Sequence, residues 1–180
     1  MQALLLIDTQ NEFSADGLRP VSNHAGALAR IQAHVEQARR EKRPIAFVLH
    51  YNRPEEWPAF QPGSWGAELS PGLGVRTGFG PEKQFAKDVF GAFSGTDIEA
   101  WLRQVGADEV LVVGFYSHMC VSTTAREALM LGFRVVIDPE ATGTRALEQV
   151  GLAKQSADDV RRSAMLHLVS MGASVLAAPR

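Results

Sequence analysis

The sequence predicts an α/β fold in which a mostly parallel sheet has helices on both faces. Three observations indicate this: short apolar runs typical of buried strands, amphipathic stretches typical of helices, and their alternation at the spacing of β-α-β units. The chain has 180 residues, which suits one domain with a single core. We find no repeat, low-complexity tract or internal boundary, so residues 1–180 are expected to form one domain.

The first half of the chain begins with a strand that is expected to lie inside the sheet. Ala3–Ile7 is a continuous apolar run, as expected for a parallel strand buried on both faces. Val21–Arg43 has apolar residues at helical spacing, and Pro44 is expected to end that helix. Ile45–Leu49 is then a second strand.

Residues 51–81 differ from the rest of the chain because they are rich in proline, glycine and aromatic residues. A loop this long inside a compact domain is usually functional or disordered. Its aromatic residues favour an ordered segment, so we expect this loop to lie over the active site. The aromatic residues of this loop include Trp57, Phe60, Trp65 and Phe79.

The second half of the chain continues the alternation of strands and helices. Lys83–Ala86 is expected to be a short strand, and Thr96 the N-cap of a helix over Asp97–Val105. The later elements are a strand at Glu109–Val113, a helix over Cys120–Leu131 that ends at Gly132, a strand at Phe133–Ile137, a mostly helical segment over Ala146–Met171 broken near Gly151, and a last strand at Ser174–Ala177.

Charge and cysteine content narrow the class of protein. Eighteen basic and twenty acidic residues give a formal charge of −2, so electrostatics offers no case for a nucleic acid or an anionic membrane as partner. The chain has one cysteine, which indicates a reducing compartment. The N-terminal apolar run is short, lacks preceding basic residues and ends in Asp8, which argues against a signal peptide. We expect a cytoplasmic protein that acts on a small molecule.

Three reactive residues follow predicted strands, where the ligands of open α/β sheets bind. Asp8 ends the first strand, Lys87 follows the third, and Cys120 begins the helix after the fourth. Each alone has an ordinary explanation: a turn residue, a solvated charge and a small core residue. The position of Cys120 favours function, because the first amides of a helix are expected to lower its pKa and to bind an oxyanion.

Three segments of the chain resemble those of the isochorismatase-like cysteine hydrolases. Leu5–Phe13 resembles the family's opening strand followed by D-x-Q-x-x-F. Lys87–Thr96 resembles its K-x-x-x-S-A-F-x-x-T segment, and Gly114–Ala128 its G-x-x-T-x-x-C-V-x-x-T-x-x-x-A segment. The third is the most specific, and all three occur in order at the family's spacing.

The resemblance implies a three-layer α-β-α sandwich whose six-stranded, mainly parallel sheet has the order 3-2-1-4-5-6. It also implies a catalytic triad of Asp8, Lys87 and Cys120, no cofactor, and a homo-oligomer. In the family a cis peptide bond, here Phe115–Tyr116, turns a backbone N–H toward the oxyanion. The oxyanion hole would therefore consist of the amides of Tyr116 and Cys120.

Two positions depart from the family's pattern. Gly91 stands where serine is usual, and Asp138-Pro139 replaces a common Asp-Ala pair. Neither touches the implied triad. The glycine is expected to leave the pocket larger near Lys87.

These observations predict a hydrolase that cleaves an amide, ureido or carbamoyl C–N bond. In this mechanism Asp8 takes the proton of Cys120, whose thiolate attacks the substrate carbonyl, while Lys87 holds Asp8 and stabilises negative charge. The aromatic residues that are expected to wall the substrate pocket could instead pack in the core. The residues expected to bind substrate are Phe13, Trp57, Phe60, Trp65 and Tyr116.

A catalytic metal is not expected. Nicotinamidases of the superfamily carry D-x-H after the second strand and a further histidine, whereas this chain reads Leu49-His50-Tyr51-Asn52-Arg53. A structural zinc site needs four ligands and a catalytic one three, and a lone histidine is poor evidence for either. His50 and His118 either line the pocket or have a structural role.

Two other functions remain open. An isochorismatase proper hydrolyses a vinyl ether and needs no nucleophilic thiol. A non-catalytic α/β module could bind a nucleotide or a protein, but Asp8-Thr9-Gln10-Asn11 after the first strand has no glycine-rich phosphate cradle, and Gly72–Gly80 does not join a strand to a helix.

Overall fold

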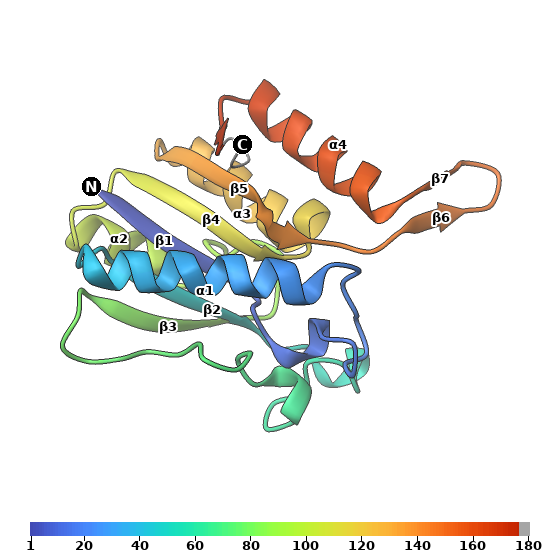
Figure 1. Ribbon diagram of the computed structural model, residues 1–180, viewed down its shortest axis with the longest axis horizontal. Coiled ribbons are helices and arrows are strands. Elements are labelled where there is room, and N and C mark those ends of the chain that lie inside the picture. The colour runs from blue at the N-terminus through green and yellow to red at the C-terminus, as the bar shows by residue number, and fades with distance from the viewer. Residues whose placement is uncertain (177–180) are drawn as a thin grey trace.

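The computed structural model describes residues 1–176 and contains a six-stranded sheet in the order β3-β2-β1-β4-β5-β8, with every pairing parallel (Figure 1). The predicted order is confirmed, with β8 as the sixth strand. The chain moves outward from β1 to β3 and then returns to β4, so the direction of winding reverses between β1 and β4. The strands are β1 (Gln2–Ile7), β2 (Ile45–His50), β3 (Glu82–Lys87), β4 (Glu109–Phe115), β5 (Arg134–Gly143) and β8 (Ser174–Val175).

Helices cover both faces of the sheet, as the three-layer prediction requires (Figure 1). Helix α1 (His24–Arg40) packs on one face, where its apolar side meets Leu4 and Leu6 of β1. Leu5 and Ile7 point to the other face and pack in a second core. The helices of that second face are α2 (Ile98–Gln104), α3 (Ser122–Met130) and α4 (Ala157–Ser170). Within residues 1–176, no helix has the length and apolarity needed to cross a membrane.

The helix predicted over Ala146–Met171 is wrong in its first part, which is a β-hairpin. Strand β6 (Leu147–Gln149) pairs antiparallel with β7 (Ala153–Gln155), and α4 begins after Ser156, whose Oγ accepts the Asp159 N–H at 3.2 Å. The hairpin projects from the body (Figure 1). Its tip residues Val150 and Leu152 are 91% and 83% exposed. A helix here would have no core to bury a face against, and Gly151 at φ +78° permits the turn.

Several other boundaries differ from the prediction. Helix α3 begins at Ser122, after a π-helical turn, η4 (Ser117–Val121), that contains Cys120. Helix α2 begins at Ile98 with Asp97 as its N-cap, so the predicted cap at Thr96 is one residue early, although Thr96 Oγ1 accepts the Ile98 N–H at 3.3 Å. The predicted last strand ended at Ala177, which lies outside the described residues.

The loop over residues 51–81 is ordered around two 3-10 turns, η2 (Pro54–Glu56) and η3 (Trp65–Ala67). The amide of Gln10 joins this loop to β1 and β2. Its Nε2 donates to His50 O at 2.9 Å and to Ala67 O at 2.8 Å, and its Oε1 accepts the His50 N–H at 2.8 Å. The loop therefore starts from a fixed position at the carboxyl ends of the strands.

Candidate active site

The carboxyl ends of three strands bring Asp8, Lys87 and Cys120 together. Asp8 follows β1, Lys87 is the last residue of β3, and Cys120 lies in η4 after β4. Lys87 Nζ is 2.9 Å from Asp8 Oδ2, and one ligand atom each of Asp8, His50 and Cys120 lie within 4.8 Å of one another. The sequence therefore identified three side chains that share one place in the fold, with His50 as a fourth.

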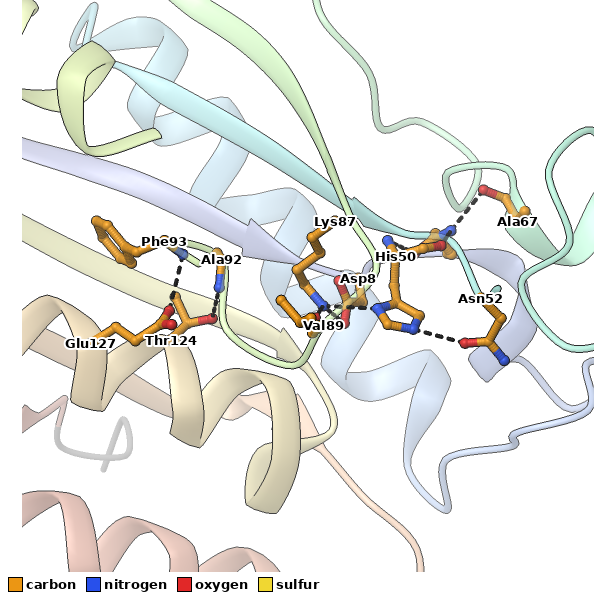
Figure 2. Close-up of polar contacts among 11 residues, drawn as sticks. Asp8, His50, Asn52, Ala67, Lys87, Val89, Ala92, Phe93, Thr124 and Glu127 are labelled. Carbon is orange, nitrogen blue, oxygen red and sulfur yellow. Dashed lines mark hydrogen bonds and ion pairs between the residues drawn. The ribbon is translucent and has the colours of Figure 1, made fainter. Parts of the chain in front are cut away.

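The Lys87 ammonium is buried and uses all three of its hydrogens (Figure 2). It donates to Asp8 Oδ2, to Val89 O at 3.1 Å and to His50 Nδ1 at 3.2 Å. Its side chain lies behind Asp8 and is not part of the cavity wall. Lys87 can therefore orient Asp8 and supply positive charge, but it does not reach the cavity itself.

His50 is held as a neutral imidazole with its proton on Nε2. Because an ammonium only donates, His50 Nδ1 must accept from Lys87, and Nε2 then donates to Asn52 Oδ1 at 2.8 Å (Figure 2). Burial, followed by the charge of Lys87, lowers the pKa of His50. His50 and Asn52 both line the cavity, whereas His118 hydrogen-bonds Thr144 Oγ1 at 2.7 Å and stacks on Tyr116.

The expectation of a low pKa for Cys120 is wrong. Burial raises the pKa of the thiol, the charge of Asp8 raises it further, and Lys87 only partly opposes them. Cys120 also lies within η4 rather than at the start of an α-helix, so the helix start on which the expectation relied is absent at this residue. The resting thiol is therefore protonated. Asp8 Oδ1 is buried without a hydrogen-bond partner among the described residues. This oxygen is therefore available as a base for the Cys120 thiol.

A cavity of about 400 Å³ opens above these groups, a size suited to a small ligand. Its wall includes Phe13, Phe60 and Tyr116, as predicted from the sequence. Ring contacts follow one another from His50 to Phe60 (5.3 Å between centroids), Phe13 (5.2 Å) and Tyr116 (4.8 Å). The peptide bond Phe115–Tyr116 is cis, as the resemblance implied.

The two predicted tryptophans do not line this cavity. Trp57 is 44% exposed and donates its indole N–H to Asn52 O at 3.2 Å, and Trp65 is 51% exposed. Both stand at the ends of 3-10 turns, which direct them to solvent. Phe60, at φ +52°, is the aromatic residue of this loop that turns inward.

Gly91 does not enlarge the pocket, contrary to the expectation from its sequence. A Cβ at Gly91 would lie 2.1 Å from Glu127 Oε1, so the carboxylate of α3 occupies that space. Glu127 accepts the Phe93 N–H at 2.9 Å (Figure 2). It also accepts the Ser94 hydroxyl at 2.5 Å. The loop after β3 is thus fastened to α3 through Glu127.

Asp8, His50 and Cys120 are close enough to be considered as metal ligands. However, the Lys87 ammonium already donates to both Asp8 and His50. A divalent cation would have to displace or adjoin that positive charge. The arrangement therefore fits a metal poorly, and the prediction that no metal takes part stays a prediction.

The cavity wall also contains charged residues that the sequence did not single out: Arg19, Arg145 and Glu56. For Arg145 a signal existed, because it follows the end of β5 and the carboxyl ends of the strands share one edge. Arg19 has no such signal, since the loop after Phe13 must fold back before this residue reaches the cavity.

Comparison with known proteins agrees with this architecture. The isochorismatase domain model matches residues 2–172. A secreted isochorismatase effector from Verticillium dahliae is 32% identical, with 84% of this chain and 77% of the relative covered. Nicotinamidase 3 from Arabidopsis thaliana is 30% identical, with 79% and 73% covered. The crystal structure of an isochorismatase from Pseudomonas putida KT2440 has a TM-score of 0.87 at 29% identity, with 97% of this chain and 86% of that chain covered.

Proposed function

This chain belongs to the isochorismatase family, and we propose that it is a cysteine hydrolase that cleaves a small amide, ureido or carbamoyl C–N bond through a thioester on Cys120. The proximity of the Cys120 sulfur and the Asp8 carboxylate at the wall of one cavity carries this proposal. A relative named a nicotinamidase supports an amide substrate. We further propose that the enzyme is a cytoplasmic homo-oligomer.

The first half-reaction forms the thioester. Asp8 Oδ1 takes the Cys120 proton, because the raised pKa of the thiol keeps it protonated until a base acts. Sulfur bonds to the carbonyl carbon as the C=O electron pair moves to oxygen. The intermediate then collapses, the C–N bond breaks, and Asp8 returns the proton to the leaving nitrogen. Lys87 keeps Asp8 oriented and favours the thiolate.

The second half-reaction regenerates the enzyme. Asp8 takes a proton from water, the hydroxide adds to the thioester carbon, and the C–S bond breaks as the thiol regains a proton. In both halves the amides of Tyr116 and Cys120 would bind the oxyanion. Such a donor is typically worth about 3 to 4 kcal/mol in the transition state.

Hydrolysis of a vinyl ether is the second candidate function. Relatives named isochorismatases favour it. This reaction proceeds without a nucleophilic thiol, so Cys120 would then be dispensable.

The decisive experiment screens small amides, ureas and carbamoyl compounds for ammonia release. Cys120→Ala and the near-isosteric Cys120→Ser are tested beside the wild type, with circular dichroism to show that each variant folds. We expect both variants to lose turnover and the wild type to show an acyl-thioester on Cys120 by mass spectrometry. Near wild-type rates in Cys120→Ala on a confirmed amide would refute the mechanism, and vinyl ether cleavage by that variant would favour the second candidate.

A further inference from the structure

Two guanidinium groups in the cavity wall form no ion pair. Arg19 and Arg145 both line the cavity, and neither pairs with a carboxylate among the described residues. Two other arginines show what an acidic partner looks like in this fold: Arg39 pairs with Glu82 at 2.9 Å and Arg30 with Asp138 at 2.6 Å. Unpaired positive charge therefore accompanies the reactive groups in one cavity.

The backbone of Arg19 is fixed beside Tyr116. Its N–H donates to Glu12 O at 3.0 Å, and its carbonyl accepts the Tyr116 hydroxyl at 2.8 Å. Glu12 is itself buried, and its carboxylate accepts the Leu18 N–H at 2.7 Å and the Phe60 N–H at 3.2 Å. Hydrogen bonds therefore hold the backbone of the loop that carries Arg19 beside the cavity.

Arg145 approaches the same end of the cavity from β5. It follows Thr144, a buried residue whose Oγ1 lies 2.7 Å from His118 Nδ1 and whose carbonyl accepts the Ser22 N–H at 3.2 Å. Its charge is felt by both neighbouring rings. After burial, Arg145 is the second cause that lowers the pKa of His118, and it opposes the burial that raises the pKa of Tyr116.

The acidic groups of the cavity leave this charge uncompensated. Asp8 is neutralised by Lys87 at 2.9 Å. Glu56 is anchored at the other end of the row of rings, where its carbonyl accepts from Asn52 Nδ2 at 3.1 Å and its carboxylate accepts the Arg53 N–H at 3.3 Å. Among residues 1–176, the Tyr116 end thus holds two cations, and the Glu12 carboxylate, whose charge acts on the Tyr116 pKa, accepts backbone N–H groups and pairs with neither guanidinium.

The geometry points to a carboxylate-binding subsite formed by Arg19 and Arg145, so that the substrate carries a carboxylate as well as the amide or carbamoyl group to be cleaved. A guanidinium matches a carboxylate through two parallel N–H···O bonds. One molecule could then present its carbonyl to Cys120 while its anionic end is held beside Tyr116. This inference rests on the proposed function for the identity of the bond that is cleaved. The binding of a carboxylate by the two arginines does not depend on that function.

Binding is measured separately from turnover to keep the two claims distinguishable. The full-length Cys120→Ala protein is titrated by calorimetry with two matched pairs, N-carbamoylglycine against N-carbamoylglycinamide and succinamate against succinamide. Within each pair the carbonyl group is shared and only the charge at the far end changes. We expect the anionic member of at least one pair to bind about tenfold tighter or more, as a charged hydrogen-bonded pair implies.

Arg19→Gln and Arg145→Gln are then introduced in the same background. Each substitution should weaken binding of the anionic member about tenfold. The affinity for the neutral member should stay within about twofold of that of the Cys120→Ala parent. Arg40→Gln, an exposed arginine on α1 outside the cavity, is the matched control and should change neither.

Equal affinities within both pairs, no binding of any of the four compounds, or loss of anion preference in Arg40→Gln would overturn the subsite. If wild-type protein releases no ammonia from any amide while the arginine-dependent preference persists, the proposed hydrolysis fails and the subsite stands. If ammonia is released equally well from both members of each pair, with unchanged rates in both arginine variants, the hydrolysis stands and the subsite fails.

Discussion

The ammonium of Lys87 lies 2.9 Å from Oδ2 of Asp8, and the two side chains are 0% and 1% exposed. Burial leaves each charge poorly solvated when its partner is lost, even though Asp8 borders the cavity. Breaking a buried pair from one side is therefore costly, whereas removing both charges together can be nearly neutral.

Replacing Lys87 with methionine should destabilise the fold by about 3 to 5 kcal/mol, because it leaves the Asp8 carboxylate buried and unpaired. Urea denaturation followed by circular dichroism measures this loss. The double variant Asp8→Asn/Lys87→Met is the control and should recover most of the stability while remaining inactive. A Lys87→Met protein that unfolds at the same urea concentration as the wild type would contradict this account of the pair.

The acidity of Cys120 should respond to the charge of Asp8. Burial comes first among the causes that raise the pKa of this thiol, and the Asp8 carboxylate adds to it. Asp8→Asn removes the negative charge and keeps Lys87, so the thiol pKa should fall by about one unit or more. Thiolate absorbance at 240 nm against pH reports it directly, because the chain has one cysteine. Cys120→Ala supplies the background, and an unchanged or higher pKa in Asp8→Asn would speak against the geometry.

Asp138 should make the protein sensitive to acid. Burial would raise the pKa of its carboxyl, but hydrogen bonds from His34 and Arg30, both at 2.6 Å, outweigh burial and hold it below the ordinary value of 3.8. Since the folded pKa is the lower one, the stabilisation is complete above the unfolded value and is lost as pH falls through the folded value.

Asp138→Asn should therefore cost about 1 kcal/mol at pH 7 and flatten the decline of stability below about pH 4. Thermal unfolding across pH 2.5 to 7 measures both effects. The exposed residue Asp16 provides the control, since Asp16→Asn should leave the pH profile as it is. Turnover should persist in Asp138→Asn because this residue does not line the cavity, and a collapse of activity in the folded variant would be unexpected.

The effects of substitutions at Gly91 and Glu127 on stability should be coupled. A methyl group at Gly91 would meet the Glu127 carboxylate, so Gly91→Ala should cost about 1 to 2 kcal/mol. With Glu127→Ala in place the space is free, and the same substitution should cost little. A double-mutant cycle by urea denaturation measures the coupling. Additive effects would show that another contact excludes a side chain at Gly91.

The parts of the fold that bury apolar surface could be predicted from the sequence. Strand β1 and helix α1 each carry a pattern that only one placement in a layered core satisfies. The hairpin of β6 and β7 could not be predicted in this way, because all its strand residues except the half-buried Leu147 are exposed and burial selects no face of it. Its helix-like composition was therefore misleading.

The candidate site likewise contains residues that the sequence could place and residues that it could not. Asp8 and Lys87 could be placed because each terminates a strand whose position in the sheet is determined by packing. Trp57 and Trp65 were misplaced because the direction of a loop side chain depends on turn geometry that composition does not encode. The raised pKa of Cys120 likewise follows from burial and from the charge of Asp8, neither of which the residue pattern around Cys120 reveals.

The direction of β1 has a practical consequence. The strand enters the sheet beside Met1, whose α-ammonium pairs with Asp108, and it leaves at Asp8, about 20 Å away for a strand of this length. A peptide tag fused ahead of Met1 would emerge at the amino-terminal end of β1, which is the end remote from the reactive groups. Protein tethered to a sensor chip through that end would keep its cavity open to the solution.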